Sequence, residues 1–446
     1  MRPNIFSHYR ATLLLGLPIM VGQIGVIVQS FADTMMVGRY ATEALAAAGF
    51  VNQIFNLMTF VLLGYSYGLT PLVSGAYGRG NEKEACHYLK QALGSNALFF
   101  ALLVGLALII YTFIDRLGQP TEVLPLARPY FLVMLASMFF VMPFNVLRQF
   151  TDGTNDTVSA MYCLLISNVL NIVGNYLLIY GIGPFPELGL LGAGISTLVA
   201  RAVMLFLLLG VVAFRKRYAP YRKAFAKTTL RWKAMWEVHR ISFPISMQIG
   251  VETACFTVSC IMAGWIGKVE AASFQVLMSI GTLGFLIYYS FGAGMSIRIG
   301  TFCGTSDWKQ AHLAMKAGMH IILVMATLAC ACFFLLQHHF VALFTEDPNV
   351  RAVSLLLMAP LITYQYADAF QIIFANALRG ISQVMPMMRA SIISYIVVGL
   401  PMGYLLGFPL GFGIQGIFFA FSIGLGTAAA LFYYYYIRHL RPLLCA

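Results

Sequence analysis

Apolar stretches long enough to cross a membrane recur along the whole chain, and short polar segments separate them. A helix of about 20 apolar residues spans the hydrocarbon core of a bilayer. The short alternating segments typical of a membrane barrel are absent from the sequence. The pattern therefore predicts an all-α integral membrane protein with twelve transmembrane helices, the first of which is too long for a signal peptide. We place them at residues 11–36, 46–73, 90–114, 126–148, 158–182, 189–214, 240–266, 271–298, 312–336, 352–378, 385–408 and 412–437.

The composition supports a membrane protein and excludes an ordinary soluble domain. Of the 446 residues, 60% are hydrophobic and 10% are charged, whereas soluble domains are roughly 45–50% apolar and about 25% charged. None of the eight cysteines falls in a loop that we assign to the outer face. We therefore expect no disulfide framework.

The positive charges predict the orientation of the helices. Nine of the 28 Lys and Arg residues lie between Arg215 and Arg240. The loops on the opposite side hold only five: Arg39, Arg116, Arg128, Lys268 and Arg351. Because loops rich in Lys and Arg stay in the cytoplasm, we expect a multi-pass protein of the plasma (inner) membrane with both termini cytoplasmic. This topology and attraction to anionic membrane lipid explain the net charge of +12 without a nucleic-acid partner.

The longest polar stretch divides the predicted helices into two sets of six. We expect an N-terminal lobe over residues 1–214, a basic cytoplasmic linker over residues 215–239 and a C-terminal lobe over residues 240–446. QIGV occurs twice, 225 residues apart, and YSYG is matched 224 residues later by YSFG. Such collinear matches favour a duplication. They predict two pseudo-symmetric six-helix bundles that enclose a central cleft.

Two tryptophans lie one helical turn apart in the basic linker, at Trp232 and Trp236. Beside basic residues, this spacing is typical of a helix that lies in the membrane interface. A polar connector that merely touches lipid explains the same residues, so both interpretations stay open.

Three of the sixteen acidic residues lie within apolar spans: Asp33, Glu252 and Asp368. On insertion scales, each such residue costs roughly 2.5–3.5 kcal/mol at a helix centre. We see no structural need for them in the sequence, and we interpret them as functional residues.

Each of the three acids shares a helix face with uncharged polar residues. These are Gln248 beside Glu252, Tyr364 and Gln371 beside Asp368, and Gln29 beside Asp33. Such a face can line an aqueous cleft, or its amides can hold helices together by hydrogen bonds. For the glutamines the sequence does not decide between these roles.

A pair of carboxylates in an apolar cleft predicts cation chemistry. A carboxylate in such a place can take up a proton, and carboxylate and hydroxyl oxygens are also ligands for a small metal cation. The same negative charge attracts an organic cation. Competition for one site would couple entry of the inorganic cation to export of the organic one, provided that the two ligands favour opposite-facing states.

Other polar residues within the spans have less definite roles. Asn171 and Asn175 lie one turn apart in the fifth span, where amides either bind a ligand or connect helices. Arg201 lies in the middle of the sixth span. It either pairs with one of the buried acids or extends toward the cytoplasmic end of its helix.

Four segments carry a family resemblance that extends over essentially the whole chain. They are ADTMMVGRYATEALAA from the end of the first span, NIVGNYLLIYG in the fifth, FPISMQIGVE in the seventh and DAFQIIFANALRG in the tenth. Together they resemble the multidrug and toxic compound extrusion (MATE) transporters, and the acids in spans seven and ten are similar to those of the NorM-like branch.

The resemblance implies two six-helix lobes around a V-shaped cleft, and antiport of small organic cations and drugs against sodium ions or protons without a cofactor. It implies a cation-binding or coupling role for Glu252, Asp368, Tyr364 and Asp33, with Glu252 and Asp368 as a possible sodium site. The residues expected to line the substrate cleft are Asn171, Asn175, Thr197, Gln248, Gln371 and Gln29. We expect the protein to be a monomer.

Two other classes of function are considered. A flippase for lipid-linked oligosaccharides would share the architecture, but it requires basic residues in the cleft, and Arg201 is the one buried base that the sequence places among three buried acids. An intramembrane enzyme is disfavoured because the chain contains no HExxH segment and no recognisable hydrolytic arrangement. A P-loop is also absent, so transport would not be driven by ATP bound to this chain.

Overall fold

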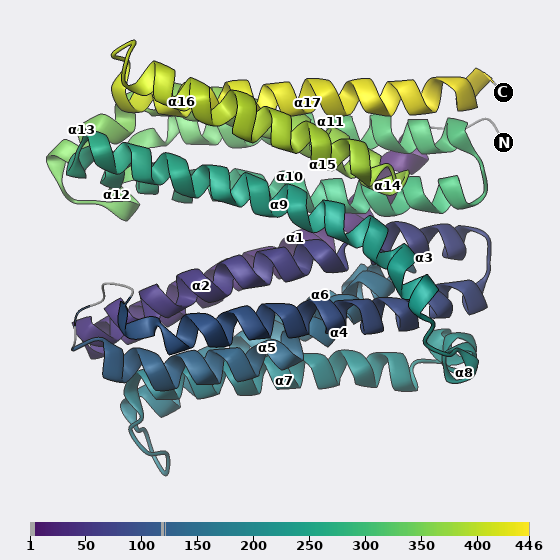
Figure 1. The fold of residues 1–446 in the computed structure, drawn as a ribbon, viewed down its shortest axis with the longest axis horizontal. Helices are drawn as coiled ribbons and strands as arrows, with labels where there is room; N and C mark the ends of the chain where they lie inside the picture. The colour runs from purple at the N-terminus through teal and green to yellow at the C-terminus, as the bar shows by residue number, and fades with distance from the viewer. Residues whose placement is uncertain (1–4, 117–119, 121, 446) are drawn as a thin grey trace. The chain divides into compact units, whose positions relative to one another are not determined.

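The computed structural model describes residues 5–116, 120 and 122–445, and every regular element in these residues is a helix (Figure 1). Eleven helices, together with one bent pair of helices, are long and apolar enough to cross a membrane. This confirms the predicted all-α class and the predicted number of spans. The two chain ends of the predicted topology, residues 1–4 and 446, lie outside the described residues.

The chain forms two compact units. One unit contains the described residues of Val21–Ser246, and the other contains those of Met1–Met20 and Met247–Ala446. Two long helices, α1 (Ile5–Tyr40) and α9 (Trp232–Ile266), therefore contribute their two ends to different units. The lobe boundaries expected from the linker, at residues 214 and 240, stay a prediction.

The unit around Val21–Ser246 contains the remaining helices of the first half. They are α2 (Thr42–Ser66), α3 (Leu69–Gly78), α4 (Glu82–Thr112), η1 (Ile114–Arg116), α5 (Leu124–Gly153), α6 (Thr157–Tyr180), α7 (Gly189–Phe214), η2 (Lys216–Tyr218) and α8 (Ala219–Lys227). Two of these helices begin at residues whose side chains accept a backbone N–H: Asn81 before α4 and Asp156 before α6. Such caps satisfy donors that the first helical turn leaves free.

The second unit contains the remaining helices of the second half. They are α10 (Lys268–Gly304), α11 (Trp308–Leu335), α12 (Gln337–Phe344), α13 (Pro348–Leu356), α14 (Met358–Gly380), α15 (Val384–Ile392), η3 (Ile393–Gly399), α16 (Leu400–Gly407) and α17 (Gly413–Cys445). The pair α13 and α14 forms the bent span, with an angle of 49° between the helices. The segment η3 is π-helical and interrupts the span between α15 and α16.

The basic linker contains a short helix and the start of a long one. Helix α8 lies within it, and α9 begins at Trp232 and continues without a break to Ile266. Trp232 and Trp236 thus lie in the first turns of a spanning helix and do not form a separate surface helix. Both indoles are largely exposed.

Gly68 separates α2 from α3 where the chain passes very close to α9. A Cβ atom at Gly68 would lie 2.3 Å from the Oγ atom of Ser242 and 2.7 Å from its Cα atom. No residue larger than glycine fits this contact without a shift of the backbone. The close approach fixes the beginning of α9 against the first half of the chain.

Candidate functional site

Two carboxylates of the second unit come together from α9 and α14. Glu252 lies on α9 one turn after Gln248, whose Nε2 atom donates a hydrogen bond to Glu252 Oε2 at 2.7 Å. Asp368 lies on α14 and is close enough to Glu252 for the two groups to interact electrostatically. The structure thus places side by side the two acids that the sequence singled out in the second half of the chain.

A tyrosine from a third element joins this pair. The hydroxyl group of Tyr395, in η3, lies near Glu252 and accepts a hydrogen bond from Gln371 Nε2 at 3.1 Å. Tyr364, one turn before Asp368, is buried and interacts electrostatically with both acids. Four polar side chains from α9, α14 and η3 therefore lie around the Glu252 carboxylate: Gln248, Tyr364, Asp368 and Tyr395.

Asp368 is only 1% exposed, and its Oδ2 atom has no hydrogen-bond partner among the described residues. The Oε1 atom of Gln248 is also buried and has no partner in the part of the chain that the structure describes. Buried oxygen atoms without donors are costly, and a charged carboxylate is the costliest case unless a proton or a cation compensates it. The site is therefore suited to a small positively charged ligand that hard oxygen atoms can hold.

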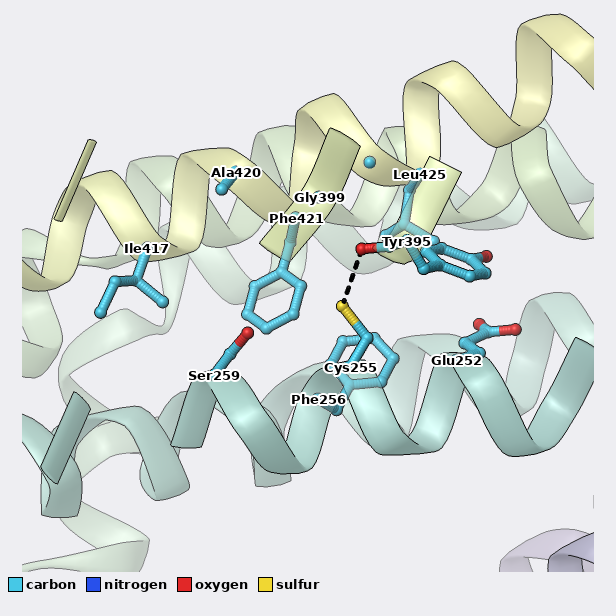
Figure 2. A pocket seen from close by; sticks show the side chains of 11 residues that line it. Glu252, Cys255, Phe256, Ser259, Tyr395, Gly399, Ile417, Ala420, Phe421 and Leu425 are labelled. Atoms are coloured by element: carbon cyan, nitrogen blue, oxygen red, sulfur yellow. Dashed lines mark hydrogen bonds between the residues drawn. The ribbon is translucent and has the colours of Figure 1, made fainter. Parts of the chain in front are cut away.

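A small pocket opens beside this group of residues (Figure 2). Figure 2 shows Glu252 and Cys255 pointing from α9 toward η3 and α17, and the Cys255 thiol donates to the carbonyl oxygen of Tyr395 at 3.7 Å. The free volume of about 10 Å³ is close to what one water molecule needs. The pocket can admit water or a small cation in this conformation, but it cannot hold an organic molecule.

A second polar cluster forms in the other unit around Asp33 of α1. Asn175 Nδ2 donates to Asp33 Oδ1 at 2.5 Å, and Gln29 forms a further hydrogen bond with Asp33. In the amide orientation of Asn171 that fits its neighbours, the nitrogen donates to Asp33 Oδ1 at 2.8 Å and the oxygen accepts from the Thr197 hydroxyl at 3.1 Å. All five residues that the sequence assigned to this side therefore meet in one cluster.

Arg201 lies beside this cluster. Its Nη1 atom donates to Ser137 Oγ at 2.6 Å, and the guanidinium interacts electrostatically with Asp33 and with Tyr130. Of the two alternatives left open by the sequence, the structure favours association with a buried acid over extension toward the helix end. Asp33 thus has a basic neighbour and several amide donors, whereas Asp368 has an oxygen atom without any donor.

Sequence reasoning missed several residues of these sites. Tyr395 and Tyr288 lie in predicted spans, and Tyr288, whose hydroxyl has no partner among the described residues, interacts electrostatically with Asp368. Tyrosines are common in membrane helices, so their presence alone carries no signal.

The two clusters contain the residues of the motifs noted above, and the comparison with protein families agrees with them. The model of the MatE family matches residues 18–177 and 244–405, which make up most of the chain. The chain belongs to the MatE family. This confirms the resemblance to MATE transporters, and the long apolar helices are those of a multi-pass membrane protein.

Individual relatives agree with the family assignment. The chain is 29% identical over 444 residues to the probable multidrug resistance protein NorM of Rhizobium meliloti, covering 98% of this chain and 94% of that protein. It is 29% identical to the multidrug resistance protein NorM of Vibrio cholerae, covering 94% and 92% of the two chains. The fold is similar to the outward-facing structure of a multidrug resistance MATE family transporter of the MOP superfamily. That comparison has a TM-score of 0.89 at 20% identity and covers 98% of this chain and 97% of the other.

Proposed function

We propose that this MatE protein is a secondary active antiporter that exports cationic or amphipathic organic compounds in exchange for sodium ions or protons. The observation that carries the proposal is the pair Glu252 and Asp368, with an Asp368 oxygen atom that has no donor among the described residues. The names of its relatives, multidrug resistance proteins, support export of drugs as the activity.

The coupling residues in this proposal are Glu252, Asp368 and Tyr364. A proton or a sodium ion bound there neutralises part of the buried charge, whereas an organic cation competes for the same negative field. Exchange requires that the two ligands stabilise opposite-facing conformations, because a ligand shifts an equilibrium only by its differential affinity. The coupling ion and the central cleft through which substrate would pass stay predictions.

The Asp33 cluster would serve a different purpose. Its carboxylate is already held by Asn175, Asn171 and Gln29 and has Arg201 nearby, so a small cation gains less there than at Asp368. We assign Asp33 and its neighbours to the substrate side of the exchange, where amides and a hydroxyl can donate to and accept from varied compounds. Gln248 and Gln371 would line the same path near the cation site.

The proposed orientation places the basic segment between Arg215 and Arg240 in the cytoplasm of the cell, with both chain ends on the same side and the protein in the inner membrane. We propose that the protein exchanges its substrates as a monomer.

Reconstitution into liposomes tests the proposal. Vesicles loaded with a fluorescent organic cation receive a sodium gradient alone, a proton gradient alone, or neither, and dye movement is followed over time. We expect one gradient to drive transport in the wild type and neither to do so in E252Q or D368N. The matched control is E346Q, because Glu346 is an exposed acid in the segment before α13. Gradient-driven transport that persists in both acid-site variants would refute the assignment.

The flippase alternative is tested in the same vesicles. A lipid-linked pyrophosphate requires basic residues to hold it. Arg201 donates to Ser137, and Arg379, a second buried base that interacts with Glu252, donates to Asn376. We expect no movement of a fluorescent lipid-linked saccharide under any of the gradients. Its movement between leaflets, with no dye transport, would assign the chain to that alternative function.

A further inference from the structure

An apolar pocket with no part in the proposed exchange lies in the unit formed by Val21–Ser246. It has a volume of about 370 Å³, within the roughly 300–1,000 Å³ that is typical of pockets for small ligands. Its walls come from four helices, including Leu89 of α4, Phe150 of α5, Leu209 of α7 and Phe225 of α8. Leu209 is 40% exposed and marks the edge of the pocket toward the outside.

Helix α8 forms one wall and is amphipathic. Tyr221 and Phe225, one turn apart, face the pocket, whereas Arg222, Lys223 and Lys227 are exposed. A short helix with aromatic residues on one face and basic residues on the other is typical of a membrane surface. The apolar face of α8 therefore covers a cavity in the unit, and its basic face lies where lipid headgroups would be.

Contacts to neighbouring elements hold α8 over the pocket. The Cys86 thiol donates to the Tyr221 carbonyl oxygen at 3.0 Å, and Lys90 Nζ donates to the Thr228 carbonyl oxygen at 2.6 Å. Two residues just before α8 donate hydrogen bonds to Asp156, which precedes α6. They are the Tyr218 hydroxyl at 2.8 Å and Arg215 Nη1 at 3.1 Å. Burial and the Asp156 carboxylate raise the pKa of the Tyr218 hydroxyl, so this donor remains protonated.

Arg222 is the charged residue that lines the pocket. Its Nη1 atom donates to the carbonyl oxygens of Val212 at 3.2 Å and of Arg215 at 3.1 Å, at the end of α7. The guanidinium has further N–H groups and lies on an exposed side chain. A guanidinium at the mouth of an otherwise apolar pocket is complementary to a phosphate that is attached to a hydrocarbon chain.

We propose that this pocket binds one acyl chain of an anionic phospholipid, with the phosphate at Arg222. The apolar walls suit a hydrocarbon chain, and the exposed Lys223 and Lys227 add attraction for a negative headgroup. The same basic residues would repel a cationic drug. The nearby acid Glu82 is exposed and screened by solvent, so it does not reverse this preference.

A lipid bound in this pocket would anchor the linker helix α8 to the membrane. Helix α8 leads directly toward α9, which contributes to both units. A lipid that wedges between α8 and the walls from α4, α5 and α7 would therefore hold the start of this connection in place. The inference depends on the proposed cytoplasmic position of the linker, but it does not depend on which ion is exchanged.

The experiment uses photoactivatable lipids and the purified full-length protein. Phosphatidylglycerol with a diazirine near the end of one acyl chain is compared with phosphatidylcholine that carries the same chain, each as a trace in proteoliposomes of neutral lipid. Crosslinked peptides are identified by mass spectrometry. We expect label on pocket residues of α4 and α7, with about five-fold more from phosphatidylglycerol, the preference that one basic residue near a surface provides. Equal labelling by the two lipids would overturn the proposal.

Matched variants separate the pocket from general attraction to the surface. L209W fills the pocket and should lose the label, whereas L102W makes the same change at an exposed position of α4 and should keep it. If L209W fails to give a monodisperse protein, A226L narrows the pocket from α8 instead. Label that persists in a folded pocket-filling variant would contradict the assignment.

The headgroup is tested in the same way with charge variants. R222Q should remove the preference for phosphatidylglycerol, whereas K223Q, an equal change of charge at the neighbouring exposed residue, should retain most of it. Equal losses in both variants would indicate a diffuse surface effect and refute a site at Arg222. Displacement of the label by an organic cation, but not by unlabelled phosphatidylglycerol, would assign the pocket to substrate. Since labelling does not measure transport, failure here is distinct from failure of the antiport proposal.

Discussion

Glu252 and Asp368 lie on different helices, yet they interact electrostatically, and Asp368 Oδ2 has no hydrogen-bond partner among the described residues. Glu252 by contrast accepts a hydrogen bond from Gln248 and has Tyr395 nearby. The two carboxylates therefore differ. Glu252 accepts a hydrogen bond, whereas Asp368 has an oxygen atom that a bound proton or cation could neutralise. This asymmetry makes Asp368 the more sensitive position for cation binding.

The first prediction concerns stability in the presence of sodium. A ligand that binds only the folded protein stabilises it by about 2.7 kcal/mol at 100 times its dissociation constant. We expect sodium chloride to raise the thermal unfolding midpoint of the detergent-solubilised wild type above that in choline chloride of equal ionic strength. D368N should lose this increase and E346Q should keep it.

The outcome also identifies the ion. A wild type whose midpoint is the same in sodium and choline does not bind sodium at this site, which leaves protons as the coupling ion. If D368N retains the full increase caused by sodium, sodium binds elsewhere and Asp368 is not its ligand.

The second prediction concerns Tyr395. Its hydroxyl accepts a hydrogen bond from Gln371 and lies near Glu252, and Tyr395→Phe leaves the Gln371 amide without this partner in a buried place. An unsatisfied buried group costs about 1–3 kcal/mol, so we expect roughly ten-fold slower exchange or an equivalent loss of apparent ion affinity. Initial rates of dye transport against ion concentration measure both. Y404F is the control, because the Tyr404 side chain is 54% exposed; equal effects of the two variants would rule out a specific role of the Tyr395 hydroxyl.

Some features could be predicted from the sequence because the membrane imposes strict conditions. A bilayer requires a long apolar helix for each span, so the spans were visible as hydrophobic runs. A carboxylate in such a run is costly, which made Asp33, Glu252 and Asp368 conspicuous. The hydrogen bond of Gln248 with Glu252 agrees with the helical spacing that linked these two residues.

Other features were harder to predict. The hydrophobic pattern predicts one helix over residues 352–378, whereas the structure bends by 49° where Leu357 joins α13 to α14. Pro360, three residues after this joint, is the signal that could have shown the bend, because a proline interrupts the helical hydrogen bonds. The π-helical turn that presents Tyr395 has an ordinary apolar sequence, ISYIVVG. Hydrophobic periodicity indicates the length and the apolar face of a span, and it carries no information on a local change of helix type.

The third prediction concerns the link between Asp33 and Arg201. The two groups interact electrostatically in the first unit. R201M leaves Asp33 without its basic neighbour, and D33N leaves Arg201 without its acid, so each single change should lower the free energy of unfolding. The double variant should lose less than the sum, with a coupling energy of about 0.5–3 kcal/mol that is typical of interacting residues.

Denaturant unfolding of the four proteins measures this coupling. V199A with D33N forms a comparison cycle, since Val199 lies on the same helix as Arg201 but is 50% exposed. If the changes in the free energy of unfolding are additive for D33N and R201M, Arg201 does not stabilise Asp33, and its role is limited to the hydrogen bond with Ser137.

The last prediction tests how tightly the start of α9 is held. Gly68 faces Ser242 so closely that an added Cβ would lie 2.7 Å from the Ser242 Cα atom. This neighbour is backbone and cannot rotate away, so Gly68→Ala forces the two segments apart. Overpacking of this kind costs typically about 1–3 kcal/mol, and we expect a lower unfolding midpoint for G68A. G49A is the matched control, since a Cβ at Gly49 in α2 meets nothing within 4 Å. Equal midpoints for the two variants would mean that the contact between Gly68 and α9 does not constrain the fold.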